Sequence, residues 1–298
     1  MVLSVLSVAV TPPRLLVVGG TGRLGRLLRG AWDLRDPGLV PVWQSRHAET
    51  PARGVWLTFD PLSDPEAFAA AARAADAVLM LAGVIAGSAA ELARNTDLAQ
   101  AAVRAAAGRP VLLASSAAVY GAGLPPDPAR GWAEGDPCTP AAPYGVAKLA
   151  MEAACAGAPG LTVLRIGNVA GADALLGQAA PEGGRRLDTF PDGRAARRSY
   201  IGPQALARAI AGLARLAAGG IALPSTLNLA LPGVVGMEDL LAADAQGWVP
   251  VPAPDAAIPE VRLDVTRALD LGVIADTPAR AAAIVADLRA LAPVEAAA

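Results

Sequence analysis

The chain has 298 residues, and its 25 Lys and Arg against 27 Asp and Glu give a formal net charge of −2. With 54% hydrophobic and 17% charged residues, the composition excludes a disordered chain and allows one large or two smaller domains. The even charge balance does not favour a nucleic-acid partner, and we expect none.

The first ten residues, 1–10, are apolar and similar in composition to the core of a signal peptide. No basic residue precedes them, and Arg14 follows them, so we expect an extension ahead of the first strand. The longest charge-free run, 216–237, contains Pro224, Asn228 and Pro232 and therefore does not form a membrane-spanning helix. We expect a cytoplasmic protein without a membrane partner.

Short apolar segments alternate along the chain with alanine-rich helical segments. The alternation predicts an α/β fold with a doubly wound parallel sheet, the Rossmann fold. The expected strands are Leu15–Val18, Val40–Trp43, Val55–Phe59, Ala77–Leu81, Val111–Ala114 and Thr162–Arg165. The expected helices include Leu24–Leu34, Pro65–Ala75, Ala89–Ala107 and Tyr144–Ala156.

A glycine-rich turn follows the first expected strand directly and leads into a helix. Spaced glycines permit a tight turn, close approach of a pyrophosphate, and close helix–strand packing, and the helix N-terminus attracts phosphates. Glycines also make ordinary turns, but this position after a first strand favours a dinucleotide site. The expected contacts are Gly19, Gly22, Arg23, Leu24 and Gly25.

The second expected strand ends in a segment without an acidic residue, Gln44-Ser45-Arg46. A carboxylate there would bind the ribose of NAD, whereas Ser45 and Arg46 are suited to the 2′-phosphate of NADP. The alternative is that Arg46 and Arg23 are simply solvated. We therefore expect NADP(H), with NAD(H) possible. Asp60, after the third strand, is expected to bind the adenine amino group or to cap the next helix.

A phenol and an ammonium group lie four residues apart at Tyr144 and Lys148, on one face of the expected helix. The lysine cation would stabilise the phenolate and bring its pKa into a range useful for proton transfer. Two serines, Ser115 and Ser116, end the fifth strand. Their hydroxyls either hold a substrate oxygen or bond their own backbone.

Other reactive side chains are few. The cysteines, Cys138 and Cys155, and the single histidine, His47, are too few for a structural zinc site, and we expect no metal. A Ser–His–Asp or Cys–His arrangement would have to use His47, which lies in a polar stretch. We interpret His47 as an exposed loop residue.

Several dispersed segments occur in the order typical of the extended short-chain dehydrogenases/reductases, the NAD(P)-dependent epimerase/dehydratase family. The chain resembles this family over about residues 14–232. The matching segments are VVGGTGRLG, VLMLAG, Asn95-Thr-Asp-Leu, SSAAVYG, Glu134 through Glu152, LRIGNVAG and Arg198-Ser-Tyr-Ile.

The resemblance implies a set of roles. Ser116 and Tyr144 are similar to the catalytic Ser/Thr and acid/base, Lys148 to the ribose-binding activator, and Asn95 to the active-site helix asparagine. Ala82, in VLMLAG, is implied to contact the cofactor, and Asn168 and Arg198 to lie near substrate phosphates.

The chain departs from the family pattern at two places that bear on the reaction. The family's 4,6-dehydratases have an Asp–Glu pair after the catalytic Ser/Thr, where this chain has Ala117 and Ala118, so dehydration is not expected. Relatives read RDFIHVDD where this chain has Arg198-Ser-Tyr-Ile-Gly-Pro-Gln-Ala. With few aromatic residues, this departure favours a compact, partly polar substrate over an obligatory nucleotide sugar.

We expect residues 12–166 and 195–231 to form the dinucleotide-binding domain, and 167–194 with 232–298 a small substrate lobe. The expected function is NAD(P)-dependent hydride transfer on a small-molecule substrate, as a reductase or as an epimerase that retains NAD. A non-catalytic dinucleotide sensor is the remaining alternative, and a homodimer is possible.

Overall fold

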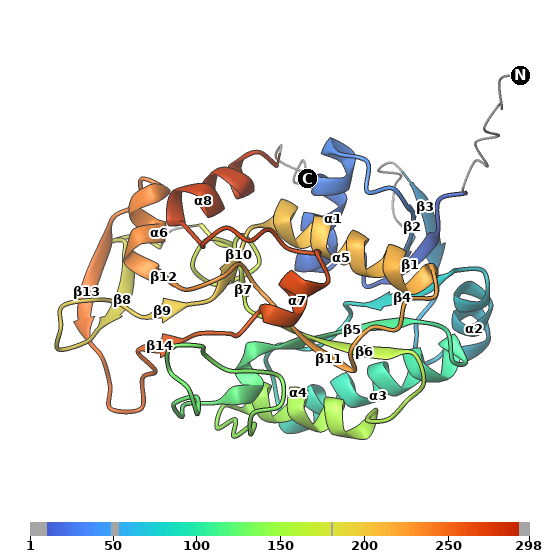
Figure 1. The fold of residues 1–298 in the computed structure, drawn as a ribbon, viewed down its shortest axis with the longest axis horizontal. Helices are drawn as coiled ribbons and strands as arrows, with labels where there is room; N and C mark the ends of the chain where they lie inside the picture. The colour runs from blue at the N-terminus through green and yellow to red at the C-terminus, as the bar shows by residue number, and fades with distance from the viewer. Residues whose placement is uncertain (1–10, 49–53, 180, 292–298) are drawn as a thin grey trace, which may run out of the picture.

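A seven-stranded, entirely parallel sheet forms the centre of the protein (Figure 1). The computed structural model describes residues 11–48, 54–179 and 181–291, so the expected extension at 1–10 lies outside the described residues. The strand order is β11-β6-β5-β4-β1-β2-β3. The strands are β1 (Arg14–Val18), β2 (Val40–Ser45), β3 (Val55–Thr58), β4 (Ala77–Met80), β5 (Val111–Ser116), β6 (Leu161–Ile166) and β11 (Thr226–Leu229). The predicted doubly wound α/β fold is confirmed.

Helices cover both faces of the sheet, because successive side chains of each strand point to opposite faces. On β1, Leu15 and Val17 belong to one buried cluster, and Leu16 and Val18 belong to the other. The first face is covered by α1 (Arg23–Leu34) and α5 (Pro203–Ala218), and the second by α2 (Pro65–Arg73), α3 (Ala89–Ala106) and α4 (Pro143–Ala154).

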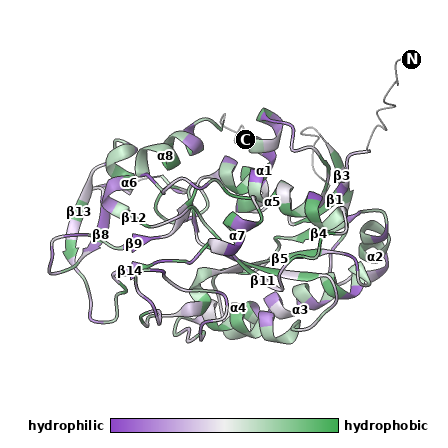
Figure 2. Ribbon diagram, viewed as in Figure 1, coloured by the Kyte–Doolittle hydropathy of each residue, from purple (hydrophilic) through white to green (hydrophobic). Residues whose placement is uncertain are grey.

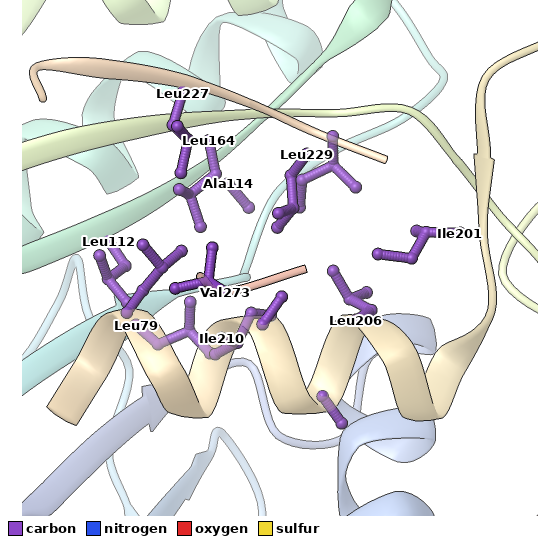
Figure 3. Close-up of a cluster of buried hydrophobic side chains, with 14 of the residues drawn as sticks. Leu79, Leu112, Ala114, Leu164, Ile201, Leu206, Ile210, Leu227, Leu229 and Val273 are labelled. Atoms are coloured by element: carbon purple, nitrogen blue, oxygen red, sulfur yellow. The ribbon is translucent and has the colours of Figure 1, made fainter. Parts of the chain in front are cut away.

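The hydrophobic pattern follows from this layering. In Figure 2 the central strands are coloured mainly as hydrophobic, whereas the helices carry hydrophilic patches. Figure 3 shows Leu206 and Ile210 of α5 pointing toward the sheet, with Ile210 on the side of Leu79 and Leu112 and Leu206 on the side of Ile201. Burying these aliphatic side chains stabilises the sheet–helix contact by about 1.5–3 kcal/mol for each side chain.

The strand order reverses between β1 and β4, because the chain builds β1, β2 and β3 outward in one direction and then returns. At such a reversal the connections after the two strands diverge and leave a crevice at the carboxyl ends. The crevice lies between the glycine-rich turn after β1 and the connection from β4 to α3.

Beyond this edge lies a smaller body of short strands and helices with its own buried cluster, which includes Leu187, Tyr200, Leu240 and Ile284. Leu187, Leu240 and Ile284 lie within the expected substrate lobe, whereas Tyr200 lies within the range expected for the dinucleotide-binding domain. The division at the stated boundaries stays a prediction. The remaining elements are η1 (Ala117–Tyr120), β7 (Asn168–Val169), β8 (Arg185–Thr189), β9 (Arg197–Arg198), β10 (Tyr200–Ile201), β12 (Val235–Gly236), α6 (Met237–Ala243), β13 (Trp248–Pro252), β14 (Glu260–Val261), α7 (Thr266–Asp270) and α8 (Ala281–Arg289).

The predicted elements are present, with ends that differ by one or two residues. One strand of the central sheet was not predicted from the sequence: β11, a four-residue segment of the charge-free run 216–237. Short apolar segments flanked by glycine and proline give little periodic signal. Within the described ranges, no helix is both long and apolar enough to cross a membrane.

Candidate active site

The glycine-rich turn after β1 is built by two close backbone approaches. Gly19 has φ +91°, and a Cβ placed on it would lie 2.7 Å from the backbone nitrogen of Ala82. A Cβ on Gly25 would lie 2.5 Å from the carbonyl oxygen of Gly20, so α1 packs directly on the turn. Gly22 is the N-cap of α1, and no side chain caps this helix. The first-turn amides of α1 therefore face the crevice, where they can bind a phosphate.

The end of β2 differs from the expected arrangement in what Ser45 does. The buried Ser45 hydroxyl donates to the carbonyl oxygen of His47, so it shapes its own turn. The Gln44 amide is also engaged, accepting from the Gly19 backbone nitrogen at 3.0 Å and donating to the carbonyl of Phe59. Arg46 is exposed, and the expected exposure of His47 is confirmed.

Asp60 lies in the turn between β3 and α2, facing two arginines. Its Oδ1 accepts from the Leu62 backbone nitrogen at 2.8 Å, and this bond lowers the pKa of Asp60 further than burial raises it, with Arg46 and Arg94 contributing. The N-cap of α2 is Asp64, not Asp60, so the idea that Asp60 caps that helix is wrong.

Asn95 lies in α3 and secures the connection that leaves β4. Its Oδ1 accepts from the Val84 backbone nitrogen at 3.1 Å, and its Nδ2 donates to the carbonyls of Val84 and Leu92, each at 2.9 Å. The side chain is 1% exposed. Its polar atoms are thus occupied by the backbone, which fixes the loop beside Gly83.

These groups line a first cavity of about 530 Å³ at the reversal of strand order. Every residue expected to bind the cofactor lines this cavity, and so do Asn95 and Tyr144. Its lining includes Gly19, Gly22, Arg23, Leu24, Gly25, Gln44, Ser45, Arg46, Asp60, Ala82, Gly83, Ile85, Arg94, Asn95, Ser115, Tyr144 and Lys148.

Helix α4 brings Tyr144 and Lys148 to the end of β5. The Lys148 Nζ donates to the carbonyl oxygen of Ala114 at 2.9 Å and lies 6.0 Å from the centroid of the Tyr144 ring. The Ser116 hydroxyl accepts from the Ala118 backbone nitrogen at 3.2 Å, and the Ser116 side chain lies close enough to the Tyr144 phenol to act on its pKa.

Burial dominates the protonation of both groups. It raises the pKa of Tyr144, against the smaller effect of the hydrogen bond with Ser116. It also lowers the pKa of Lys148 to about 8, against the attraction of Glu152. The expected lowering of the Tyr144 pKa by Lys148 is therefore not seen, because desolvation of the phenolate is the largest effect and only the Ser116 side chain opposes it.

A second cavity, of about 590 Å³, adjoins the first. Ser116, Tyr144, Asn168 and Arg198, the residues expected near the substrate, all line it. The two cavities share Arg23, Leu24, Ile85, Ser115 and Tyr144. A molecule in the first cavity and another in the second would therefore meet beside the Tyr144 hydroxyl.

The Arg198 guanidinium is already bound to backbone. It donates from Nη1 to the carbonyls of Arg197 at 2.8 Å and Pro259 at 3.3 Å, and from Nη2 to that of Ile258 at 2.8 Å. Burial lowers the pKa of Arg198, with Tyr200 and Glu260 acting in the opposite direction.

Several cavity residues are not in the expected set. Arg94 is exposed on α3, Ile85 is 54% exposed in the β4–α3 connection, and Asp173 lines the second cavity. Burial raises the pKa of Asp173, whose Oδ2 accepts from the Tyr200 hydroxyl at 2.6 Å. Of these three residues, only Arg94 could have been inferred from the sequence, because it directly precedes Asn95 on the same helix.

Among the described residues, no cluster of His, Cys, Asp and Glu is suited to a metal ion.

A family model described as the NAD dependent epimerase/dehydratase family matches residues 15–190, more than half of the chain. The chain belongs to this family. No protein of curated function matches the sequence significantly.

Solved structures show the same fold. UDP-glucose 4-epimerase from Brucella ovis in complex with NAD has a TM-score of 0.74 at 21% identity, over 93% of this chain and 97% of its own. A putative epimerase from Burkholderia cenocepacia has a TM-score of 0.72 at 23% identity, over 94% and 99%. MoeE5 in complex with UDP-glucose and NAD has 0.69 at 23%, over 93% and 99%.

The three tyrosines, of which Tyr120 and Tyr200 are fully buried and Tyr144 partly buried, give a prediction about alkaline pH. Burial raises the pKa of Tyr120 to about 12 and raises those of Tyr144 and Tyr200 above the ordinary value of 10.0. Because the folded state then binds more protons than the unfolded state, folding stability is retained below pH 10 and falls as the pH rises further. An ultraviolet titration of phenolate should show little ionisation at pH 10 in the folded protein, and ordinary ionisation in denaturant. A tyrosine that ionises below pH 10 in the folded protein contradicts this, and Tyr144→Phe assigns the signal.

Proposed function

We propose that the protein is an NAD(P)-dependent oxidoreductase that acts on a carbonyl or hydroxyl carbon of a small substrate. The observation that carries this proposal is the meeting of the two cavities at Tyr144, with Ser116 and Lys148 beside it. The family is NAD-dependent, and several structural neighbours were solved with NAD.

The first cavity fits a dinucleotide on its own geometry. The uncapped N-terminus of α1 offers amides to a pyrophosphate, and Gly19 allows the close backbone approach that a Cβ would prevent. Arg23, Leu24 and Ala82 would contact the dinucleotide along the crevice, and Lys148 would hold the ribose next to the nicotinamide.

A bound nicotinamide dinucleotide supplies the hydride chemistry. The protein supplies proton transfer and orientation: Tyr144, neutral at pH 7, donates its phenolic proton to the substrate oxygen during reduction and takes it back in the reverse direction. Ser116 orients that oxygen by a hydrogen bond, and the Lys148 ammonium favours the transient phenolate. Asn95 acts indirectly, by fixing the β4–α3 connection.

We propose NADP(H) as the favoured cofactor, with NAD(H) possible. The first cavity is lined by three guanidinium groups, Arg23, Arg46 and Arg94, against the single carboxylate of Asp60. Gln44 is neutral at the strand end where a carboxylate would bind the ribose of NAD. Because the Ser45 hydroxyl already donates a hydrogen bond to the His47 carbonyl, Arg46 rather than Ser45 is the main candidate to bind the 2′-phosphate.

Titration with both reduced cofactors tests this preference. We expect tighter binding of NADPH than of NADH, and Arg46→Ala should remove about tenfold or more of the difference, since a hydrogen bond to a charged group contributes about 1.5–3 kcal/mol. Arg104→Ala, on the same helix as Arg94 but outside the cavity, is the control. Equal or NADH-preferring affinity in the unmutated protein overturns the preference.

The second cavity supports a compact, partly polar substrate. Its polar side chains include those of Arg198, Asn168 and Asp173. Among its lining residues Tyr144 is the one aromatic residue on which a nucleobase could stack. Ala117 and Ala118 line it where dehydration would need acidic groups, so we do not propose a dehydratase. Tight, saturable binding of UDP-glucose would overturn the compact substrate while leaving the hydride chemistry in place.

A nucleotide-sugar epimerase that retains NAD is the second candidate, favoured by neighbours such as the Brucella ovis UDP-glucose 4-epimerase in complex with NAD. Mass spectrometry of the natively purified protein separates the two, because retained NAD indicates an epimerase and an exchanging site indicates a reductase. A dinucleotide sensor on the same fold would bind cofactor without any turnover.

Removing the Tyr144 hydroxyl tests the catalytic proposal. Tyr144→Phe should lower turnover by at least about 10²–10⁴-fold, because the proton carrier is lost, and leave dinucleotide affinity nearly unchanged. Lys148→Ala should damage both, because it would contact the ribose as well. The measurement is oxidation of NADPH with a panel of small keto compounds, alongside binding by nicotinamide fluorescence. Near-normal turnover by Tyr144→Phe would contradict the assignment of Tyr144 as the group that transfers the proton.

A further inference from the structure

Three residues of α4, spaced four apart, contact three successive residues at the end of β5. Tyr144 lies beside Ser116, whose side chain acts on its pKa, and Lys148 donates to the Ala114 carbonyl at 2.9 Å. Between these two strand positions, the Ser115 hydroxyl donates to Oε1 of Glu152. A four-residue spacing keeps the helix residues on one face, so Glu152 makes the third contact of the row that carries Tyr144 and Lys148.

Glu152 is held in turn from the neighbouring strand. Arg165 of β6 donates to its Oε2 from Nη2 at 2.8 Å and from Nε at 3.1 Å, and the two side chains are 8% and 7% exposed. Arg165 is the register partner of Ser115 in the β5–β6 pair. The Arg165 Nη1 also donates to the Tyr120 hydroxyl at 3.2 Å, so the carboxylate is fixed by contacts from two strands.

The surroundings of Lys148 make the charge of Glu152 important. The Nζ faces the Ala114 carbonyl of β5, the Met151 sulfur at 3.7 Å, and the Tyr144 ring of its own helix. From the β4–α3 side, a Cβ on Gly83 would lie 3.5 Å from this Nζ and 2.6 Å from Oδ1 of Asn95. None of these neighbours is a carboxylate. The negative charge of Glu152, one helical turn further along α4, raises the pKa of Lys148 against the lowering by burial.

We propose that Glu152 is a positioning residue for the active site, whose carboxylate fixes α4 against the end of β5 and keeps the Lys148 ammonium charged. The inference rests on the proposed role of Lys148 in holding the dinucleotide. A buried ion pair contributes little net stability compared with apolar side chains of similar volume. The placement of Glu152 one helical turn beyond Lys148 instead gives the lysine a fixed counter-charge.

The pH dependence of NADPH affinity, followed by nicotinamide fluorescence from about pH 6 to 10, tests the proposal. In the unmutated protein we expect affinity to fall as the pH rises through about 8, where Lys148 loses its proton. In Glu152→Gln the fall should begin on the order of one pH unit lower, because an opposite charge is lost. Glu152→Asp retains the charge, so the pH midpoint of its fall in affinity should lie close to that of the unmutated protein. Glu66→Gln, which removes an exposed carboxylate from α2, should leave it unchanged.

Three outcomes are decisive. If Lys148→Met leaves the fall near pH 8 in place, Lys148 is not the titrating group, and both its proposed role and this inference fail. If Lys148→Met removes the fall but folded Glu152→Gln does not shift it, this inference alone fails. Should Glu152→Gln not fold with Arg165 left unpaired, the double variant Glu152→Gln/Arg165→Met is compared with Arg165→Met, because these two proteins differ only in the charge at position 152. Equal midpoints in the two overturn the inference equally.

Discussion

The close contact between the turn after β1 and the end of β4 is the constraint on which both cavities depend. Gly19 adopts φ +91° and lies so near the Ala82 backbone that no side chain fits between them. Because the two strands are neighbours at the reversal of strand order, this contact sets the width of the crevice. The N-terminus of α1, the Asn95-bound connection and the Lys148 ammonium all face the space that remains.

The sequence was sufficient for the fold because its signals are local and repeated. Strands such as Val111–Ser116 are apolar throughout and buried on both faces, which distinguishes them from the alanine-rich helices between them. β11 gave no such signal, since its four residues are recognisable only by their pairing with β6. Its place in the sheet is decided by tertiary contacts.

The candidate site could be predicted at the level of residues but not of their bonds. The glycine turn and the Tyr144–Lys148 spacing identified which side chains converge, because each follows a strand end or begins a helix. What these side chains bond was not predictable: the Ser45 hydroxyl turns to His47, and the Asn95 amide binds the backbone. The Tyr144 pKa depends on the depth of burial, a property of the assembled core that no spacing encodes.

The three carbonyl contacts of Arg198 have a consequence for selectivity. An anion that reaches this guanidinium competes with the backbone of Arg197, Ile258 and Pro259, so its affinity is the difference between two sets of hydrogen bonds. A bidentate carboxylate or phosphate group can replace two parallel bonds at once, whereas a single hydroxyl cannot. Since Arg198 and Ile258 both line the second cavity, these hydrogen bonds tie two parts of its wall together.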